Sequence, residues 1–459
     1  MTNDYVVKIL NFTHTIFPRC RNIKQKFAFS SKDNCKSKIL ILKQGKAKNI
    51  ITYIKEAEKD GIKGLIIENK IDKEYLPKNI PLLRVQNLSE NLNAILNHFY
   101  SDPMKNMYVI GVTGTDGKTS TCHHVAQFLS YIYPRKKIGM ITSEGNGIYP
   151  KLSKTEFTTP DSHILYSEYD KFRKNNVKII IIECSSQGLA QGRLNSHSFN
   201  LSILTNINRD HIDYHKTISR YINSKMKLLE MTNYFILINN DNKKININNS
   251  QAKKIFYETR DHSNKLMKIS TSTDLIKKIA AILKIKDQKK IGSAISNLKP
   301  IKGRFNIFKG KNNQTIIVDY AHTSSSFLLA CKSAVNTFNS NQQKNKLLIV
   351  FGCGGDRDKS KRKEMGKIAS KYADHIILTD DNPRSENPKN ITYEISKALM
   401  KKTSYEIINN RKMAIKKSIK LTSADDIVLI IGKGNEPMIM YNNKKVKHND
   451  IEYINTLIR

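Results

Sequence analysis

A glycine-rich turn that follows an apolar run constrains this chain more than any other segment. Residues 107–113 are largely apolar and lead into the sequence GTDGKTS at residues 114–120. The two glycines lack side chains, so backbone N–H groups can converge on an anion, and a helix beginning near Lys118 would direct its positive end to the same point. Lys118 would then neutralise the outer phosphates, and the Thr119 hydroxyl would bind Mg²⁺. The segment therefore predicts a phosphate-binding loop between a buried strand and a helix.

The loop departs from the strict phosphate-loop motif G-x-x-x-x-G-K-[ST] by one residue. Val112 stands where the first glycine is required, and the glycine lies at position 111. An ordinary tight turn between a strand and a helix is the alternative interpretation. A Gly-Lys-Thr triplet after an apolar strand rarely arises from turn chemistry alone, and we therefore favour phosphate binding.

The length and charge of the chain bound its organisation. At 459 residues it is too long for one hydrophobic core, and we expect three domains, at residues 1–103, 104–300 and 301–459. A formal net charge of +38 suggests a polyanionic partner such as nucleic acid. The lysines, however, are spread along the chain among Ile and Asn, without an arginine-rich stripe. We expect solvated surface lysines and no nucleic-acid partner, with a nucleic-acid-binding ATPase as the alternative from a different class.

The cysteines and the apolar runs indicate a compartment. The six cysteines, at positions 20, 35, 122, 184, 331 and 353, show no C-x-x-C spacing. We interpret them as free thiols in a reducing cytosol. No signal peptide is visible, and no apolar run reaches the roughly 20 residues that a membrane span needs. We therefore expect a soluble cytoplasmic protein with no membrane span.

The first 103 residues are typical of a small α/β unit. We predict strands at 38–42, 64–68 and 81–85, and helices at 49–60 and 89–100. No catalytic motif is visible in them. Pro103 marks a plausible boundary, because the residue before a proline resists helix formation.

Two strands of the second unit end in polar side chains. The isoleucine run at 178–183 predicts a fully buried parallel strand that presents Glu183 at its carboxyl end, where a phosphate-binding fold holds Mg²⁺. A surface charge at a strand end is the alternative for Glu183. The strand predicted at 201–206 leads into RDHIDYH at 209–215. This group of Asp and His residues is suited to binding a cation or a phosphate.

The third unit alternates strands with helices. The predicted strands are 315–318, 346–351, 375–378 and 426–431, and the predicted helices are 324–338, 361–372, 391–402 and 412–420. This alternation predicts a Rossmann-like, doubly wound parallel sheet. The strands are followed by the polar segments DYAH (319–322), GCGGDRD (352–358), TDDNPR (379–384) and GKGNE (432–436). Ligands bind at the carboxyl edge of such sheets, so we expect these segments to line one site, although each alone could be a turn.

These motifs together resemble a known family. The segments that carry the resemblance are GVTGTDGKTS (111–120), ECSSQGL (183–189), TNINRDHIDYH (205–215), GRF (303–305), VDYAHT (318–323), the GGDRD cluster and DNPR (381–384). They closely resemble the Mur ligases, which add amino acids to the peptide stem of the peptidoglycan precursor with ATP. The resemblance covers nearly the whole chain in order and is weak before residue 100. It implies an N-terminal UDP-binding domain, a central ATPase-like domain with a parallel sheet, and a C-terminal amino-acid-binding domain.

The resemblance implies a ligase reaction that uses ATP and Mg²⁺. It implies addition of meso-diaminopimelate to UDP-N-acetylmuramoyl-L-alanyl-D-glutamate through an acyl phosphate, by an enzyme that we expect to be a monomer. It implies ATP contacts at Gly114, Thr115, Asp116, Gly117, Lys118, Thr119, Ser120, Arg304 and Asp319. It implies Mg²⁺ ligands at Thr119, Glu183, His211 and Lys225, the last as a carbamate formed with CO₂. Lys118, Lys225 and His211 would be the catalytic residues.

The same resemblance implies residues for the two other substrates. The UDP-substrate would contact Ser31, Thr158, Thr159, Ser185, Gln191 and Arg193. Diaminopimelate would contact Arg357, Asp381, Asn382, Pro383, Arg384, Gly432 and Glu436. A guanidinium for a carboxylate and a Glu for an ammonium is the chemistry that the distal end of this amino acid demands.

Related activities remain as alternatives within the ligases. A lysine-adding Mur ligase would have no use for Arg384, and a folylpolyglutamate synthase shares the fold and the phosphate-binding loop. Four positions depart from the usual family pattern: Gln187 and Asn435 replace histidines, and Asp274 and Lys277 stand where asparagines usually reach the adenine.

Overall fold

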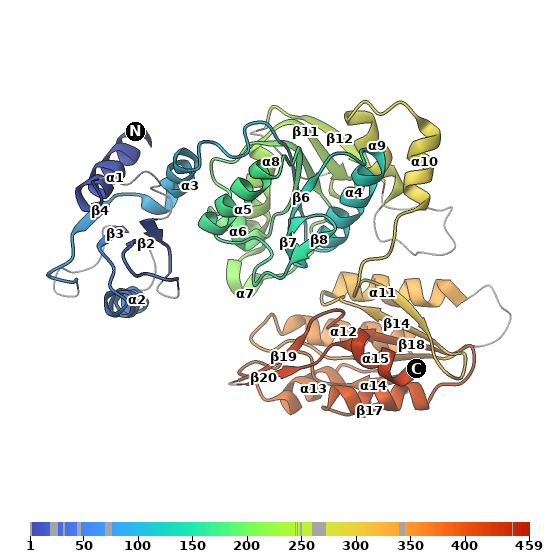
Figure 1. Ribbon diagram of the computed structural model, residues 1–459. Helices are drawn as coiled ribbons and strands as arrows, with labels where there is room; N and C mark the ends of the chain where they lie inside the picture. Colours follow the sequence, from blue (N-terminus) through green and yellow to red (C-terminus); the bar gives the residue numbers. More distant parts are fainter. Residues whose placement is uncertain are drawn as a thin grey trace.

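The computed structural model describes most of the chain as three α/β units (Figure 1). The described residues are 2–18, 26–30, 33–43, 47–68, 76–243, 245, 247, 250–258, 272–338, 345–442 and 444–459. Each unit is built on a sheet whose strands are mainly parallel. The α/β fold class predicted from the sequence is therefore confirmed.

The N-terminal unit has a four-stranded parallel sheet in the order β1-β2-β3-β4. Its strands are β1 (Phe27–Ala28), β2 (Ile39–Leu42), β3 (Gly64–Glu68) and β4 (Leu82–Val85). Its helices are α1 (Thr2–Ile16), α2 (Ala47–Lys59) and α3 (Leu88–Phe99). Alternate residues of β2 pack against α2 on one face and against α1 and α3 on the other, which explains why this strand is apolar throughout.

The central unit has an eight-stranded sheet in the order β12-β11-β10-β5-β9-β6-β7-β8. Its strands are β5 (Tyr108–Thr113), β6 (Ile138–Thr142), β7 (Gly145–Ile148), β8 (Lys151–Ser153), β9 (Ile179–Glu183), β10 (Phe199–Leu204), β11 (Thr232–Asn239) and β12 (Lys253–Tyr257). Only the last two in the spatial order, β7 and β8, pair in antiparallel fashion. The predicted phosphate-binding strand, β5, lies in the middle of the parallel part.

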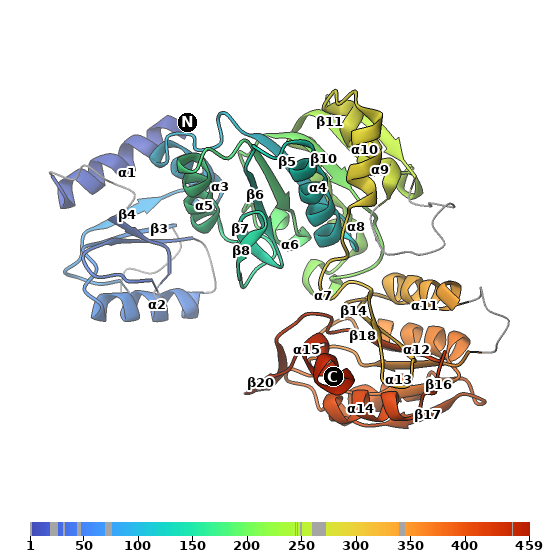
Figure 2. The same cartoon turned by 45° about the vertical axis from the view of Figure 1, so that its right-hand side comes forward.

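Helices cover both faces of the central sheet. They are α4 (Lys118–Ile132), α5 (Ser162–Lys174), α6 (Ser186–Ala190), α7 (Ile212–His215), α8 (Ile218–Glu230), α9 (Thr273–Ile282) and α10 (Gln288–Ser296). One hydrophobic core joins the sheet to α4, α9 and α10. Another joins the opposite face to α5 and α8 and continues into α1 and α3 of the N-terminal unit, of which α3 lies beside α5 in Figure 2.

The C-terminal unit has a six-stranded sheet in the order β13-β14-β18-β15-β16-β17. Its strands are β13 (Asn306–Lys309), β14 (Thr315–Asp319), β15 (Leu347–Phe351), β16 (His375–Leu378), β17 (Ser404–Ile407) and β18 (Ile427–Ile431), and a hairpin joins β19 (Met438–Tyr441) to β20 (Lys444–Lys447). Its helices are α11 (Ser324–Phe338), α12 (Ser360–Tyr372), α13 (Pro388–Ser396), α14 (Arg411–Lys420) and α15 (Asp450–Ile458). The first three cover one face and α14 and α15 the other, so the sheet is doubly wound as predicted.

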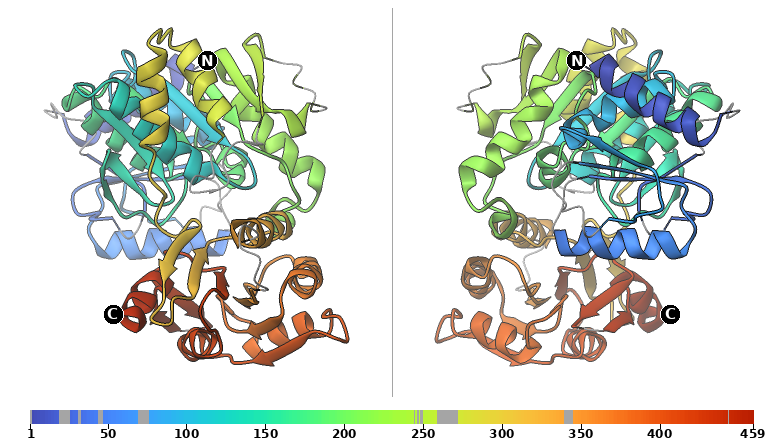
Figure 3. Two further views of the ribbon diagram at one scale, coloured as in Figure 1. Left: turned by 90° about the vertical axis from the view of Figure 1, so that its right-hand side faces the viewer. Right: turned by 90° about the vertical axis from the view of Figure 1, so that its left-hand side faces the viewer.

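A single connection after α10 leads from the central unit to β13 (Figure 3). The C-terminal unit lies below the central unit, with α11 next to the loops that follow the central strands (Figure 3). This arrangement brings the carboxyl edges of two sheets toward each other. Ligands of α/β sheets bind at those edges, so the fold places two potential binding edges together.

The structure corrects one helix and describes the thiols. The helix predicted at 391–402 spans Pro388–Ser396. It begins earlier than predicted because Pro388 occupies its first turn and the Asn387 side chain caps it. The five cysteines among the described residues are buried free thiols, as expected, and Cys20 lies outside them. Within the described ranges, every helix is too short or too polar to cross a bilayer.

Candidate active site

The phosphate-binding loop lies between β5 and α4. Gly114 follows β5 with a φ of +149°, and Gly117 caps α4 with a φ of +78°. A Cβ atom on Gly114 would lie 1.9 Å from Thr205 Oγ1, so the backbone passes too close to the end of β10 for a side chain. The loop therefore depends on glycine and presents the first N–H groups of α4 to an anion.

Two lysine side chains converge on this loop. Lys118 Nζ donates to the carbonyls of Gly114 and Thr115 at 3.0 and 2.8 Å. Lys225, which is buried, donates to the same Gly114 carbonyl from α8 at 2.5 Å. Burial, and next the charge of Lys118, lower the pKa of Lys225 well below its ordinary value. The Lys118 ammonium and the first N–H groups of α4 make the loop a favourable place for phosphate oxygens.

A hydroxyl and a carboxylate meet beside the loop. Thr119 Oγ1 donates to Glu183 Oε1 at 2.9 Å, and the Ser143 amide donates to Glu183 Oε2 at 2.9 Å. Within the described residues, no three His, Cys, Asp or Glu side chains converge to hold a cation by themselves. Mg²⁺ in phosphate sites usually takes one or two protein ligands together with phosphate oxygens and waters. The Thr119–Glu183 pair therefore fits a magnesium–nucleotide complex.

His211 lies at the start of α7 with a φ of +54°. Its Nε2 atom is 3.3 Å from Asp210 Oδ2, and His322 of the C-terminal unit lies 3.8 Å from the same oxygen. Burial lowers the pKa of His211 to about 4, although Asp210 opposes the shift. A neutral imidazole is the form that can bind a metal. The expected metal ligands thus form separate contacts: Thr119 with Glu183, His211 with Asp210, and Lys225 with the loop.

Among the remaining predicted nucleotide residues, Asp116 links the central and C-terminal units. Asp116 of the loop accepts hydrogen bonds from Thr323 Oγ1 at 3.0 and 3.1 Å and from Ser325 Oγ at 3.1 Å, at the start of α11. Asp319, at the end of β14, accepts from the amide of Phe305 at 2.7 Å. The neighbouring Arg304 guanidinium lies 4.0 Å from the centre of the Tyr320 ring. Ser120 is buried in the first turn of α4.

The four polar segments of the C-terminal sheet meet at one edge, as the sequence predicted. Asn382 Nδ2 and the Tyr320 hydroxyl donate to the two oxygens of Glu436 at 3.0 and 2.9 Å. Lys433, which is fully buried, forms an ion pair with Glu436 and donates to Asn382 Oδ1 at 2.8 Å. Burial alone would raise the pKa of Glu436, but Lys433 lowers it. Glu436 is therefore held as a carboxylate in a fixed position.

Two arginines lie next to this network. Arg384 has a φ of +53° and donates from Nη1 to the Gly355 carbonyl at 2.8 Å. A Cβ atom on Gly354 would meet Arg384 Nη1 at 2.9 Å and Arg357 Cγ at 3.8 Å, so the two side chains flank this glycine. Gly432 is equally constrained, since a Cβ atom there would lie 2.4 Å from Asp381 Oδ2. Pro383 separates Asn382 from Arg384 in the same segment. The edge thus offers two guanidinium groups and fixed carboxylates to a zwitterion.

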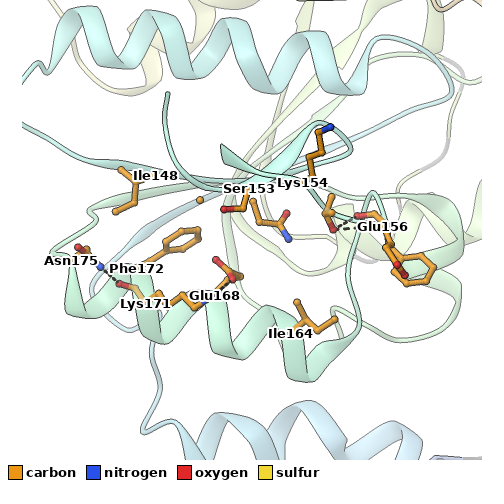
Figure 4. Close-up of a pocket in the computed structure, with 13 residues that line it drawn as sticks. Ile148, Ser153, Lys154, Glu156, Ile164, Glu168, Lys171, Phe172 and Asn175 are labelled. Carbon is orange, nitrogen blue, oxygen red and sulfur yellow. Dashed lines mark hydrogen bonds and ion pairs between the residues drawn. The ribbon is translucent and has the colours of Figure 1, made fainter. Parts of the chain in front are cut away.

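Two hollows are lined wholly or partly by the central unit. One of about 490 Å³ opens between the β7–β8 hairpin and α5, where Phe172 and the ion pair of Glu168 with Lys171 line it (Figure 4). None of the predicted site residues that the structure describes lines this hollow. A smaller one, of about 220 Å³, lies between the central and C-terminal units, and Asp210 and Thr323 are among its lining residues. The second hollow is the one that adjoins the phosphate-binding loop.

Comparison with known proteins identifies the family. Residues 112–308 match the model of the Mur ligase middle domain, and residues 303–434 match that of the Mur ligase, glutamate ligase domain. A protein of Wigglesworthia glossinidia brevipalpis named UDP-N-acetylmuramoyl-L-alanyl-D-glutamate--2,6-diaminopimelate ligase is 34% identical, over 99% of this chain and 99% of its own. The chain belongs to the Mur ligase family. The resemblance inferred from the sequence motifs is confirmed.

Solved structures agree with this assignment. A structure of a UDP-N-acetylmuramoyl-L-alanyl-D-glutamate--2,6-diaminopimelate ligase has a TM-score of 0.59 and 25% identity, and the match covers 94% of each chain. A folylpolyglutamate synthase from Thermotoga maritima has a TM-score of 0.55 and 16% identity, and covers 74% of this chain and 89% of its own. The second likeness shows a common fold alone.

The residues that the Mur ligase resemblance assigns to the UDP-substrate lie beside the end of β9. Thr159 Oγ1 donates to the Glu183 carbonyl at 2.7 Å and accepts from the Ser185 amide at 2.9 Å. Arg193 donates to the Thr159 carbonyl at 2.5 Å and to Gln191 Oε1 at 2.8 Å. Thr158 precedes Thr159 in the same segment, and Ser31 lies outside the described residues. Through Glu183, these side chains adjoin the part of the loop that carries Thr119.

Two polar residues of this Mur ligase contact the predicted site residues but were not predicted from the sequence. Ser143 contacts both Glu183 and Thr119, and the buried Tyr221 hydroxyl lies 2.8 Å from Thr115 Oγ1. Tyr221 also underlies Lys225, whose Nζ is 4.5 Å from the centre of its ring. Ser143 directly follows a buried strand, a signal that the sequence carried, whereas nothing local marks Tyr221.

Lys43 of the N-terminal unit was also missed. It follows the buried strand β2, and burial lowers its pKa, with Asp161 opposing the shift and Arg193 adding to it. Nearby, the rings of Phe29 and His163 stack with centres 4.7 Å apart. The N-terminal unit therefore contributes a cation and an aromatic ring next to the residues expected to hold the UDP-substrate.

Three of the positions that depart from the usual family pattern have visible partners. Asn435 Nδ2 donates to Glu144 Oε2 of the central unit at 3.2 Å, and Gln187 Oε1 accepts from Ser186 at 3.2 Å. Asp274 accepts from the Glu258 amide at 2.9 Å, near the start of α9. Asn435 thus joins the polar edge of the C-terminal sheet to the loop that carries Ser143 and Glu144.

Proposed function

We propose that this Mur ligase joins the amino group of meso-diaminopimelate to the free carboxylate of UDP-N-acetylmuramoyl-L-alanyl-D-glutamate, with ATP converted to ADP and phosphate. One observation carries the proposal. The phosphate-binding loop of the central unit lies next to the edge of the C-terminal sheet that carries Arg357, Arg384 and Glu436, which we call the amino-acid edge. Asp116 of the loop accepts a hydrogen bond from Thr323 of the C-terminal unit. A phosphate donor on one edge would therefore face an amine on the other.

The chemistry required of the protein is mainly positioning and neutralisation of charge. The γ-phosphoryl group passes to the carboxylate oxygen, the acyl phosphate is attacked by the amine, and the tetrahedral intermediate loses phosphate to leave an amide. Lys118, at the amino end of α4, neutralises charge on the transferred group. Thr119, Glu183, His211 and a carbamylated Lys225 would hold Mg²⁺, which neutralises the phosphates when it is bound.

Carbamylation of Lys225 is supported by its surroundings. The amine is buried, and burial together with Lys118 favours its uncharged form. An uncharged amine is the form that reacts with CO₂. The resulting carbamate would place a negative charge next to the Lys118 ammonium, and that pair of opposite charges is favourable.

The amino-acid edge favours diaminopimelate over lysine. The distal end of diaminopimelate carries a carboxylate and an ammonium, whereas lysine has only the ammonium. Arg384 and Arg357 offer guanidinium groups for that carboxylate, and the negative charge of Glu436 is suited to the ammonium. A lysine-adding enzyme would leave both arginines without a function. We likewise propose that Thr158, Thr159, Ser185, Gln191 and Arg193 hold the UDP-substrate.

ADP release by the purified protein tests this function. The assay contains ATP, Mg²⁺ and the UDP-muramoyl-dipeptide, with either meso-diaminopimelate or L-lysine as acceptor. We expect turnover that depends on diaminopimelate. Turnover with lysine that ignores diaminopimelate would contradict the specificity, turnover with a folate and glutamate would indicate a folylpolyglutamate synthase, and stimulation by nucleic acid would favour the ATPase alternative.

A further inference from the structure

Two ion pairs of opposite direction join the central and C-terminal units next to the amino-acid edge. Arg209 of the central unit pairs with Asp358 of the C-terminal unit at 3.3 Å. Asp213, which lies four residues after Arg209 in the central unit, pairs with Arg357 of the C-terminal unit at 3.0 Å. Each unit thus contributes one cation and one anion to the same contact. The two pairs are similar in kind, but they differ in what lies behind them.

Arg357 belongs to the amino-acid edge, whereas Arg209 does not. Arg357 Cγ and Arg384 Nη1 flank Gly354, because a Cβ atom on this glycine would contact both of them. Burial, and next the charge of Arg357, lower the pKa of Arg384, so the two guanidinium groups repel each other across that glycine. Like charges held close together favour an anion between them. The distal carboxylate of the proposed amino acid is such an anion.

The contact with Asp213 controls how Arg357 is presented. Asp213 Oδ2 accepts from Nη1 of Arg357 at 3.0 Å. A guanidinium carries its Nε and Nη2 donors on another edge, and that edge can bind a carboxylate through two parallel hydrogen bonds. The Arg357 side chain is 43% exposed, so without a partner it would sample many conformations. Asp213 fixes one of them by a bond at a single nitrogen.

We propose that Asp213 is a positioning residue for the amino-acid substrate: from the central unit it orients Arg357 so that this arginine and Arg384 bind the distal carboxylate together. The inference rests on the proposed function. It means that the amino-acid site is complete only when the central and C-terminal units are docked, although the residues that touch the amino acid come from the C-terminal unit. By linkage, binding of the amino acid also favours docking.

Asp213→Asn tests this role, and Arg209→Gln is the matched control, because it removes the other ion pair between the same two units. We expect Asp213→Asn to raise the KM for meso-diaminopimelate roughly three- to fivefold, as a partly exposed ion pair allows, with little change in kcat or in the KM for ATP. Arg209→Gln should leave the KM for meso-diaminopimelate near the wild-type value. Asp213→Glu should restore most of the affinity.

A double-mutant cycle keeps the inference falsifiable if the single variants are less active for other reasons. In an Arg357→Gln background, Asp213→Asn should change the KM for meso-diaminopimelate no further. Equal effects of Asp213→Asn and Arg209→Gln on all three substrates would show a simple clamp between units and overturn the role, as would a fall in KM. If the wild-type protein does not use meso-diaminopimelate, both the proposed function and this inference are overturned. If the wild-type protein turns over normally and Asp213→Asn and Arg209→Gln have equal effects, only the inference is overturned.

Discussion

Replacing Gly114 by alanine should disable the phosphate-binding loop by a defined clash. The new Cβ atom would lie 1.9 Å from Thr205 Oγ1 and 3.0 Å from the Asn206 amide nitrogen. Overpacking costs about 1–3 kcal/mol, and a backbone with φ of +149° costs a non-glycine residue about 1–3 kcal/mol more. The Thr205 side chain can rotate, at the loss of its 2.7 Å bond to the Asp116 carbonyl. We therefore expect the lower part of the range, about 2–4 kcal/mol.

Nucleotide binding measured by calorimetry is the assay for Gly114→Ala. If the cost falls on the conformation that binds phosphate, ADP and ATP should bind roughly 30- to 1000-fold more weakly. Gly61→Ala is the control, because Gly61 also has a positive φ, +81°, but open space around it and a place in the N-terminal unit. It should lower stability by about 1–2 kcal/mol and leave nucleotide affinity unchanged.

A second substitution tests the cause of the effect. Thr205→Ala removes the oxygen that the new Cβ atom would strike, so Gly114→Ala combined with Thr205→Ala should bind nucleotide better than Gly114→Ala alone. Wild-type affinity and stability in Gly114→Ala would refute the proposed clash. An unrepaired double variant would show that the backbone conformation, and not the contact with Thr205, is the dominant cost.

Three further predictions concern other parts of the site and its support. Lys118→Ala should abolish turnover with any acceptor, whereas Arg384→Ala should mainly raise the KM for diaminopimelate, by roughly 10- to 100-fold; equal loss of kcat in both would contradict these roles. With ¹³C-bicarbonate, wild-type protein should show a carbamate NMR signal that is absent from Lys225→Arg, and its absence from both would rule out carbamylation. Asp450→Asn leaves the buried Arg411 without its 2.7 Å partner and should destabilise the protein by about 3–5 kcal/mol in urea unfolding. Burial alone would raise the pKa of Asp450, but the Arg411 charge outweighs this effect and the pKa falls to about 2. The stabilisation is therefore present above about pH 4 and is lost as the pH falls toward 2.

The sequence by itself determined the elements and the chemistry at their ends. Most expected strands and helices are present within a residue or two, because buried parallel strands are continuously apolar and amphipathic helices repeat every 3.6 residues. The polar groups that follow the strands meet at sheet edges because parallel strands all end on the same side. The short strand β17 was missed, since three of its four side chains are exposed and leave no apolar pattern.

Only the tertiary structure decided which polar side chains meet. Asp213 and Arg357 are 144 residues apart in the chain, and Tyr221 and Thr115 are 106 apart. No local periodicity encodes such pairs, because they depend on how two sheets are docked and on how α8 crosses the end of β5. The sequence could therefore predict the phosphate-binding loop and the amino-acid edge separately. Their juxtaposition, with a central residue orienting an arginine of the other unit, is a property of the folded chain.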